Sequence, residues 1–515
     1  MHRSPDPRWT VTASVVADVR AAEEQVMAQL PTGALMQRAA AGLAAEVVEV
    51  LETTTGGVYG REVVLLVGPG NNGGDALWAG ARLAARGARV QALLAASTAH
   101  SEGLAALRAA GGRSRHVPDG DAADELWTAH LVVDGLLGIG GRPGLRGAAA
   151  ELGERASSLP SDVPVVAVDL PSGVDPDTGE TPGPHVRATH TVTFGVLKPC
   201  LLLPPGRVAA GEVRLVDIGL PSTDPAVMTT GSAGLAARWP VPGSDDDKYS
   251  RGVVGVVAGG PTYTGAAVLC SGAAVRTGAG MVRYVGPDEP TDLVRARWPE
   301  VVPGEGRVQA WVLGPGLDPE HDVGQRAAVQ RALASDLPCV VDAGALTLLP
   351  ERRDAPTLLT PHAGELARLL SDGDDKVERG DVEASPLRHA RRAAELTGAT
   401  VLLKGSTTLV VDADRIVRAQ DDGPHWLATA GSGDVLAGVL GTLLAAGLPT
   451  HVAGEVGVAV HGIAGAIASS GGPASAGSVL EALPAAVTTL LTGARRAGRG
   501  APIGVRGHRL REWHA

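Results

Sequence analysis

The sequence predicts an α/β fold made of two successive domains, each with a mainly parallel sheet covered by helices. The chain has 515 residues, too many for one ordinary hydrophobic core. Apolar strand-like runs alternate with helical runs in two series, separated by residues 221–250. Such alternation is typical of βαβ units. With 70 Gly but only 8 Trp, 4 Tyr and 1 Phe, the cores are built mostly from Ala, Val and Leu, which suits buried parallel strands.

Charge and cysteine usage exclude several classes of function. A net charge of -11 gives no general attraction to nucleic acid or anionic membranes. The three cysteines, Cys200, Cys270 and Cys339, are far apart and form no CxxC pair, which argues against a disulfide scaffold and a structural zinc site. Residues 1–10 do not read as a signal peptide, and the apolar stretches are short or rich in Gly and Ser. We therefore expect a cytoplasmic protein with neither nucleic-acid nor membrane partners.

The first series begins with an amphipathic helical segment over residues 15–50. A strand over 62–67, a Gly-rich turn, a helix over 75–86 and a strand over 89–94 then form a βαβ unit. Two further apolar strands end at Asp134 and Asp169. Both place a carboxylate at a strand end.

The second series follows a Pro-, Ser- and Ala-rich stretch over 221–250, which we interpret as a linker or a lead-in. Its elements include a strand near 252–258, a helix over 265–277 and a long helix after Gly433. The last residues carry six arginines and predict a solvated, flexible tail. The expected domains are 1–225 and 226–493, with a basic tail over 494–515.

The first chemical cluster is the GPGNNG turn over residues 68–73, which fits GxGxxG between a strand and a helix. A dinucleotide fold of the usual kind also has a carboxylate after the next strand, and none follows 89–94 here. A standard dehydrogenase is therefore a poor fit. Amide, carboxylate and hydroxyl oxygens at neighbouring strand ends suit a hard cation, and Asn72, Asp134 and Ser172 could meet there. The alternative is that the aspartates only cap turns.

Four blocks within 60–220, of which NNGGD and DLPSGVD are the most specific, resemble the NAD(P)H-hydrate epimerase family. The resemblance implies a Rossmann-like three-layer domain that binds K+ through Asn72, Asp134 and Ser172. It also implies substrate contacts from the following residues: Asn71, Asn72, Gly73, Gly74, Asp75, Gly138, Ile139, Gly140, Gly141, Arg142, Pro143, Gly144 and Asp169. Ala76 stands where the family usually has Gly.

Epimerisation at a carbon that bears a hydroxyl and a ring nitrogen needs a group that exchanges protons, whether the ring opens or water leaves and returns. Position and resemblance make Asp169 the candidate catalytic residue. Lys198, in GVLKP, is a second candidate, although a surface or loop lysine is the favoured reading for it.

The second chemical cluster is Ala430-Gly431-Ser432-Gly433-Asp434, directly before an apolar helix. Backbone N–H groups at a helix start stabilise a phosphoryl group in transit, and Asp434 could act there as a base. The loop over 404–408, KGSTT, is suited to gripping nucleotide phosphates.

Together with GPGLD, VVDAGAL and TPHAGE, these motifs resemble the ADP/ATP-dependent NAD(P)H-hydrate dehydratase family of the ribokinase-like superfamily, over about 248–470. The resemblance implies a ribokinase-like α/β domain in which Asp434 is catalytic. Nucleotide contacts would come from Lys404, Gly405, Ser406, Thr407, Thr408 and Gly433. Contacts to the hydrated cofactor would come from Ala266, Gly316, His362 and Asp434. Asp318 replaces the family's usual Gly, and His461 is expected to pack between helices.

The two resemblances predict an enzyme that epimerises the R and S forms of hydrated NADH and NADPH (NADHX and NADPHX) and dehydrates the S form. ADP or ATP would be consumed with Mg2+, giving AMP or ADP and phosphate, and we expect a homo-oligomer. Two alternatives stay open: a vitamin or sugar kinase with an accessory domain, and an N-terminal half that only binds or scaffolds.

Overall fold

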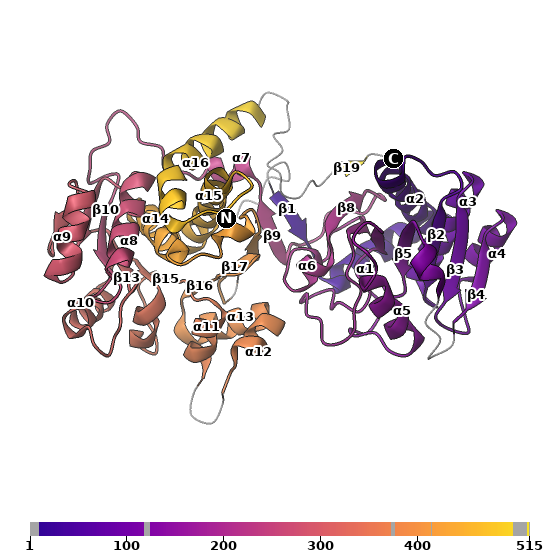
Figure 1. Cartoon of the computed structure of the whole chain (residues 1–515), viewed down its shortest axis with the longest axis horizontal. Coiled ribbons are helices and arrows are strands. Elements are labelled where there is room, and N and C mark those ends of the chain that lie inside the picture. Colours follow the sequence, from indigo (N-terminus) through magenta and orange to yellow (C-terminus); the bar gives the residue numbers. More distant parts are fainter. Residues whose placement is uncertain (1–9, 118–123, 372–375, 414, 498–511, 514–515) are drawn as a thin grey trace. The chain divides into compact units, whose positions relative to one another are not determined.

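The structure is a computed structural model that describes residues 10–117, 124–371, 376–413, 415–497 and 512–513. The chain divides into two compact units (Figure 1). Of the described residues, the first unit contains 12–227 and 512–513, and the second contains 10–11 and 228–497. Each unit is an α/β layer structure around its own sheet, as the sequence predicts. Of the basic tail, the structure describes only the last helical residues to Ala497 and the strand Glu512–Trp513; the rest lies outside the described residues.

The first unit contains a parallel sheet in the order β19-β8-β7-β6-β5-β2-β3-β4. Its strands are β2 (Glu62–Val67), β3 (Arg89–Leu94), β4 (Arg113–His116), β5 (Leu131–Gly135), β6 (Val165–Val168), β7 (His190–Phe194), β8 (Glu212–Val216) and β19 (Glu512–Trp513). Its helices are α1 (Val16–Met27), α2 (Ala34–Thr55), α3 (Asn71–Ala85), α4 (Ser101–Ala109), α5 (Ala148–Ser157) and α6 (Gly206–Ala209), with 3₁₀ turns at Asp124–Thr128 and Pro199–Leu201.

Alternating strand side chains of this sheet face two separate cores. Val63, Leu65 and Val67 pack with apolar residues of α2 and α3, whereas Val64 and Leu66 pack with residues of α5. Helices therefore cover both faces, which makes the unit a three-layer α/β/α domain. The carboxyl ends of β2, β5, β6 and β7 lie at one edge of this sheet, because all of these strands are parallel.

The second unit has a mixed sheet in the order β1-β9-β18-β17-β16-β15-β14-β13-β10-β11-β12. Its strands are β1 (Thr10–Ala13), β9 (Val227–Thr230), β10 (Val253–Val257), β11 (Met281–Tyr284), β12 (Val302–Pro303), β13 (Ala310–Leu313), β14 (Cys339–Val341), β15 (Thr357–Leu359), β16 (Thr400–Leu403), β17 (Thr408–Val411) and β18 (Val417–Gln420). The pairs from β12 to β16 are parallel, and β16, β17 and β18 are antiparallel.

The helices of this unit are α7 (Ser232–Ala236), α8 (Thr264–Thr277), α9 (Asp288–Arg297), α10 (Val323–Leu333), α11 (Ala363–Leu370), α12 (Arg379–Ala384), α13 (Pro386–Thr397), α14 (Ser432–Ala445), α15 (Thr450–Ser469) and α16 (Ala476–Ala497), with 3₁₀ turns at Ala343–Leu348 and His425–Leu427. The stretch 221–250 is not purely a linker, because β9 joins the sheet of the second unit and α7 packs into the hydrophobic core of that unit through Leu235. Both elements are too short for a periodic signal.

Two helices of the second unit combine length with an apolar composition that includes Gly and Ser. α15 and the Ala476–Gly493 part of α16 are long and apolar enough to cross a membrane. Both nevertheless supply buried residues to the core of the second unit, together with α8 and α14. That placement is the one expected of core helices.

Candidate functional site

In the first unit, the residues singled out from the sequence gather at the carboxyl edge of the sheet. The segment Asn71–Asp75 is the first turn of α3 and directly follows β2. Asp134 lies in β5, Asp169 follows β6, and Lys198 follows β7. Because these strands are parallel neighbours, the side chains lie at the same end of the sheet.

Asp134 and Ser172 are in direct contact. The Ser172 hydroxyl donates to Asp134 Oδ1 at 2.6 Å, and the Ser172 N–H donates to Oδ2 at 2.9 Å. The Leu136 N–H also donates to Oδ1, at 3.2 Å. Asp134 is fully buried and none of these partners is a cation, so burial raises the pKa of this carboxyl to about 6.

Asn72 completes the oxygen-rich group on the α3 side. A Cβ at Gly138 would lie 2.9 Å from Asn72 Oδ1, so only glycine leaves room beside this amide. Among the described residues, Asn72 Nδ2 is buried without a hydrogen-bond partner. A buried carboxylate without a basic partner, beside an amide and a hydroxyl oxygen, fits the K+ ion that the resemblance implies.

The loop over 138–144, expected to contact substrate, is held by backbone bonds at both ends. The Gly141 N–H donates to Gly138 O at 3.0 Å, and the Gly144 N–H donates to Gly173 O at 2.8 Å. Arg20 of α1 donates to Ile139 O at 2.9 Å. The same loop contains Gly140, Arg142 and Pro143. It lies next to Asn72, which Gly138 contacts.

Asp169 and Lys198 form a buried ion pair, with Lys198 Nζ 2.5 Å from Asp169 Oδ1. Lys198 also donates to Thr193 Oγ1 and to Phe194 O, both at 3.1 Å. The Lys198 side chain is 1% exposed, so the surface-lysine interpretation is wrong. Asp169 has a φ of 69°, a conformation that costs about 1–3 kcal/mol for a non-Gly residue and is common at functional sites.

The sequence analysis did not identify Asp75 and Glu23 of the first unit as ionisable groups of this site. Burial and the charges of Asp169 and Glu23 raise the pKa of Asp75 well above its usual value. Burial is also the main cause that raises the pKa of Glu23 on α1, which feels the charges of Lys198 and Asp169. Asp75 was expected only to contact substrate, and Glu23 had no motif to mark it.

In the second unit, Lys404 is the centre of a charged group at the carboxyl ends of β14 and β16. Its Nζ donates to Asp342 Oδ1 at 2.8 Å and lies 3.8 Å from Glu365 Oε2. Asp342 Oδ1 also accepts from the Thr360 hydroxyl at 2.8 Å. Asp342 and Glu365 stand in the VVDAGAL and TPHAGE motifs, but the sequence did not identify them as site residues.

Asp434 lies in the first turn of α14, and Gly431 precedes that helix with a φ of 85°. Burial, followed by the charge of Asp342, raises the pKa of Asp434 to about 7, while Lys404 acts in the opposite direction. A Cβ at Gly433 would lie 3.4 Å from Lys404 Nζ, so the glycine-rich turn adjoins the lysine. N–H groups at a helix start and an ammonium are both groups that attract a phosphate.

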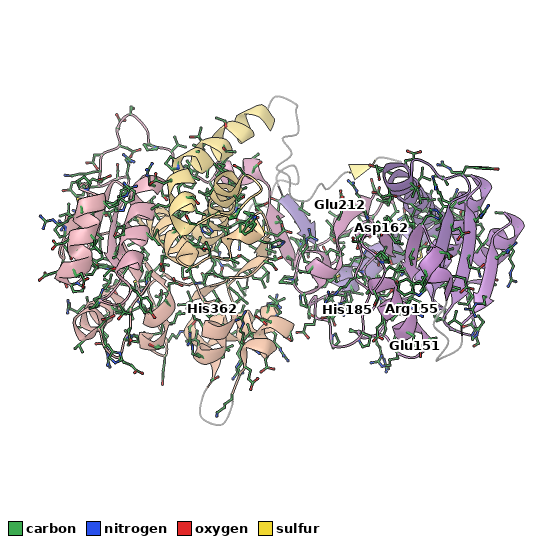
Figure 2. All side chains as sticks on the ribbon, in the orientation of Figure 1. Glu151, Arg155, Asp162, His185, Glu212 and His362 are labelled. Carbon is green, nitrogen blue, oxygen red and sulfur yellow. The ribbon has the colours of Figure 1, made fainter. Side chains whose placement is uncertain are left out.

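The other predicted residues surround this group. His362 is the N-cap residue of α11, and its Nδ1 accepts a hydrogen bond from the Gly364 N–H at 3.0 Å. The backbones of His362 and Lys404 form an isolated parallel β-bridge. Figure 2 shows His362 at this helix start. Ala266 and Gly316 adjoin each other, since a Cβ at Gly316 would lie 2.4 Å from the Ala266 Cβ.

The loop after Lys404 divides into an outer and an inner part. Gly405 and Ser406 are exposed, whereas Thr407 and Thr408 are buried at the start of β17. His461 packs within the helix interface as expected, and its Nε2 lies 3.1 Å from the Ser432 hydroxyl. Burial lowers the pKa of His461 to about 4, so a neutral ring supports the glycine-rich turn.

Both halves of the chain match known proteins. Residues 32–200 match the family model described as YjeF-related protein N-terminus, and residues 254–479 match the model described as NAD(P)H-hydrate dehydratase. The chain is 48% identical over 469 residues to a bifunctional NAD(P)H-hydrate repair enzyme of Mycobacterium leprae, covering 88% of this chain and 93% of the relative. It is 49% identical over 449 residues to the enzyme of the same description from Mycobacterium tuberculosis, covering 84% and 89%. A solved ADP/ATP-dependent NAD(P)H-hydrate dehydratase from Bacillus subtilis matches at 26% identity, with a TM-score of 0.46, covering 50% of this chain and 97% of that one.

Proposed function

On the premise that the chain belongs to the family of bifunctional NAD(P)H-hydrate repair enzymes, we propose which residues perform each of its two reactions. The enzyme epimerises the R and S forms of NADHX and NADPHX and dehydrates the S form to NADH or NADPH at the expense of ADP or ATP. The observation that carries the assignment is that each family model falls within one unit and includes the candidate catalytic aspartate of that unit.

Epimerisation is assigned to the first unit, with Asp169 as the residue that accepts and returns the hydroxyl proton. The Lys198 ammonium lies 2.5 Å from Asp169 Oδ1 and holds this carboxyl group in place for proton transfer. The turn Asn71–Asp75 and the loop over 138–144 would bind the hydrated nicotinamide on either side. K+, held by Asn72, Asp134 and Ser172, would supply a fixed positive charge next to the substrate.

Dehydration is assigned to the second unit, where phosphorylation turns the C6 hydroxyl into a better leaving group. Asp434 takes the hydroxyl proton while that oxygen attacks the terminal phosphorus of the nucleotide. Loss of phosphate and of a ring proton then restores the dihydropyridine. Lys404 and the N–H groups of the Ala430–Gly433 turn hold the transferred phosphoryl group, and Ala266, Gly316 and His362 position the ring.

The nucleotide is held by the loop Lys404–Thr408 and by Gly433 in this proposal. Mg2+ would enter with the nucleotide and neutralise phosphate charge, keeping mostly water and phosphate ligands. We propose a cytoplasmic location, because Cys200, Cys270 and Cys339 are free and buried thiols. We also propose a homo-oligomer, as the sequence analysis expects.

The test uses separated R and S epimers of NADHX with the full chain, Mg2+, K+ and either nucleotide. Absorbance at 340 nm should return for the S epimer at once and for the R epimer through epimerisation. A phosphorylated product that accumulates without NADH formation would instead support the kinase alternative. If the S epimer is repaired while the R epimer reacts only at the uncatalysed rate, the first unit does not have its proposed activity.

A further inference from the structure

The first unit holds two carboxyls whose surroundings differ sharply. Asp169 accepts from Lys198 at 2.5 Å and from Thr193 Oγ1 at 3.2 Å, so its negative charge is neutralised and hydrogen-bonded. Asp75 Oδ1 is buried and, among the described residues, accepts no hydrogen bond. An ionised carboxylate with one oxygen buried and unbonded would be poorly solvated, whereas a protonated carboxyl loses less on burial.

Charge balance around Asp75 supports the same conclusion. The charge of Asp169 acts on both Glu23 and Asp75, and the charge of Glu23 acts on Asp75. The ammonium of Lys198, paired with Asp169, opposes these effects at both groups. Arg20, on α1, donates to the Ile139 carbonyl, and its charge acts on Glu23. Burial, then the charges of Asp169 and Glu23, raise the pKa of Asp75, and Lys198 only partly offsets them.

The imidazole of His100 packs on Gly74 at the turn before α4. The His100 Nδ1 accepts a hydrogen bond from the Gly103 N–H at 3.1 Å and so caps α4. Among the described residues, no ion pair joins His100 to Asp75, Glu23 or Asp169.

Lys198 is poorly placed to act as the proton donor to substrate. An ammonium has three N–H bonds, and those of Lys198 are used on Asp169, Thr193 and the Phe194 carbonyl. Its side chain is only 1% exposed, beneath Asp169. Lys198 is thus a positioning residue for Asp169, and the acid must be a different group.

We propose that Asp75 carries a proton in the resting enzyme and is the general acid that works opposite Asp169; this inference rests on the proposed epimerase function. Asp169 takes the proton of the C6 hydroxyl, a C6=O bond forms, and the C6–N1 bond breaks with its electron pair going to N1. Asp75 gives its proton to N1. The aldehyde rotates about the C5–C6 single bond, and N1 attacks the other face of C6 to re-form the C6–N1 bond. Asp75 takes back its proton from N1, and Asp169 returns its proton to the oxygen. Both residues are then in their starting protonation states.

The closing experiment compares Asp75→Asn and Asp75→Glu with Asp162→Asn, a change at an exposed aspartate of the same unit that Figure 2 labels. Each full-length variant is assayed with the R epimer and, in the same sample, with the S epimer, and its thermal unfolding is recorded. We expect Asp75→Asn to lower kcat for R-epimer repair by roughly 10²- to 10⁴-fold with KM changed only a few-fold. Dehydration of the S epimer and the melting temperature should match those of Asp162→Asn.

The pH profile separates an acid from a residue that only binds. In the wild type, R-epimer repair should fall at alkaline pH as Asp75 loses its proton, and this fall should be retained at a lower rate in Asp75→Glu and absent in Asp75→Asn. The inference would be overturned by an Asp75→Asn variant that keeps the wild-type kcat, that changes only in KM, or whose R-epimer repair still falls at alkaline pH. If the wild type repairs neither epimer, the proposed function itself fails, and that result is distinct from all of these.

Discussion

Replacing Lys198 by methionine tests the buried ion pair of the first unit. The change removes the ammonium 2.5 Å from Asp169 Oδ1 and leaves the carboxylate, whose side chain is 10% exposed, without its cation. Breaking a buried pair by removing one partner costs about 3–5 kcal/mol. Methionine is close in size to lysine, so the lost charge and hydrogen bonds dominate that cost. The unfolding free energy of the unit should fall by that amount.

The same change should also abolish epimerisation, because Asp169 would no longer be held in a fixed position. The assay is urea unfolding together with R-epimer repair, and Lys376→Met, at an exposed lysine, is the matched control. A Lys198→Met/Asp169→Asn double variant should recover most of the lost stability but no epimerase activity, since no charge is then left unpaired. Unchanged stability and an unchanged R-epimer rate in Lys198→Met would refute the reasoning.

The remaining predictions concern the second reaction and the two ligands. Asp434→Asn should lower dehydration of the S epimer by roughly 10²- to 10⁴-fold and leave epimerisation intact. Because Asp434 must be ionised to act and its pKa is about 7, kcat/KM for dehydration should fall as the pH drops below about 7 and level off above it; a flat profile would contradict this role. Lys404→Ala should raise the KM for ADP or ATP at least tenfold in initial-rate measurements, with Thr53→Ala as an exposed-helix control. K+ should raise the melting temperature more than Na+ does, and Asp134→Asn should remove that difference, whereas equal effects of both ions would argue against the site.

The strands could be predicted because strands buried on both faces consist mostly of apolar residues. The runs over 62–67 and 89–94 coincide with β2 and β3, whose residues are mostly apolar on both faces. Helix α3 begins at Asn71 rather than at Asp75, because the asparagines and glycines after Gly70 form its first turn. Glycine there admits close backbone approach: a Cβ at Gly73 would lie 2.2 Å from Gly68 O. Local composition alone favoured a turn.

The electrostatic part of the sites was largely unpredictable because its partners are distant in sequence. Lys198 and Asp169 are 29 residues apart, and Lys404 and Asp342 are 62 apart. Nothing in the GVLKP motif indicates that its lysine is buried. Asp342 could have been found by the argument used for Asp134 and Asp169, since it also follows a buried apolar strand. The raised pKa of Asp75 comes from burial and from the charges of Asp169 and Glu23 on other elements, so it could only come from the structure.

The most direct test of the central claim follows absorbance at 340 nm with equal amounts of R and S NADHX, ADP or ATP, Mg2+ and K+. The account predicts that the wild type restores NADH from both epimers, that Asp169→Ala restores it from the S epimer with the R epimer left at its uncatalysed rate, and that Asp434→Ala restores neither. Absence of recovery with either nucleotide in the wild type would contradict the claim that the two units perform consecutive steps of one repair.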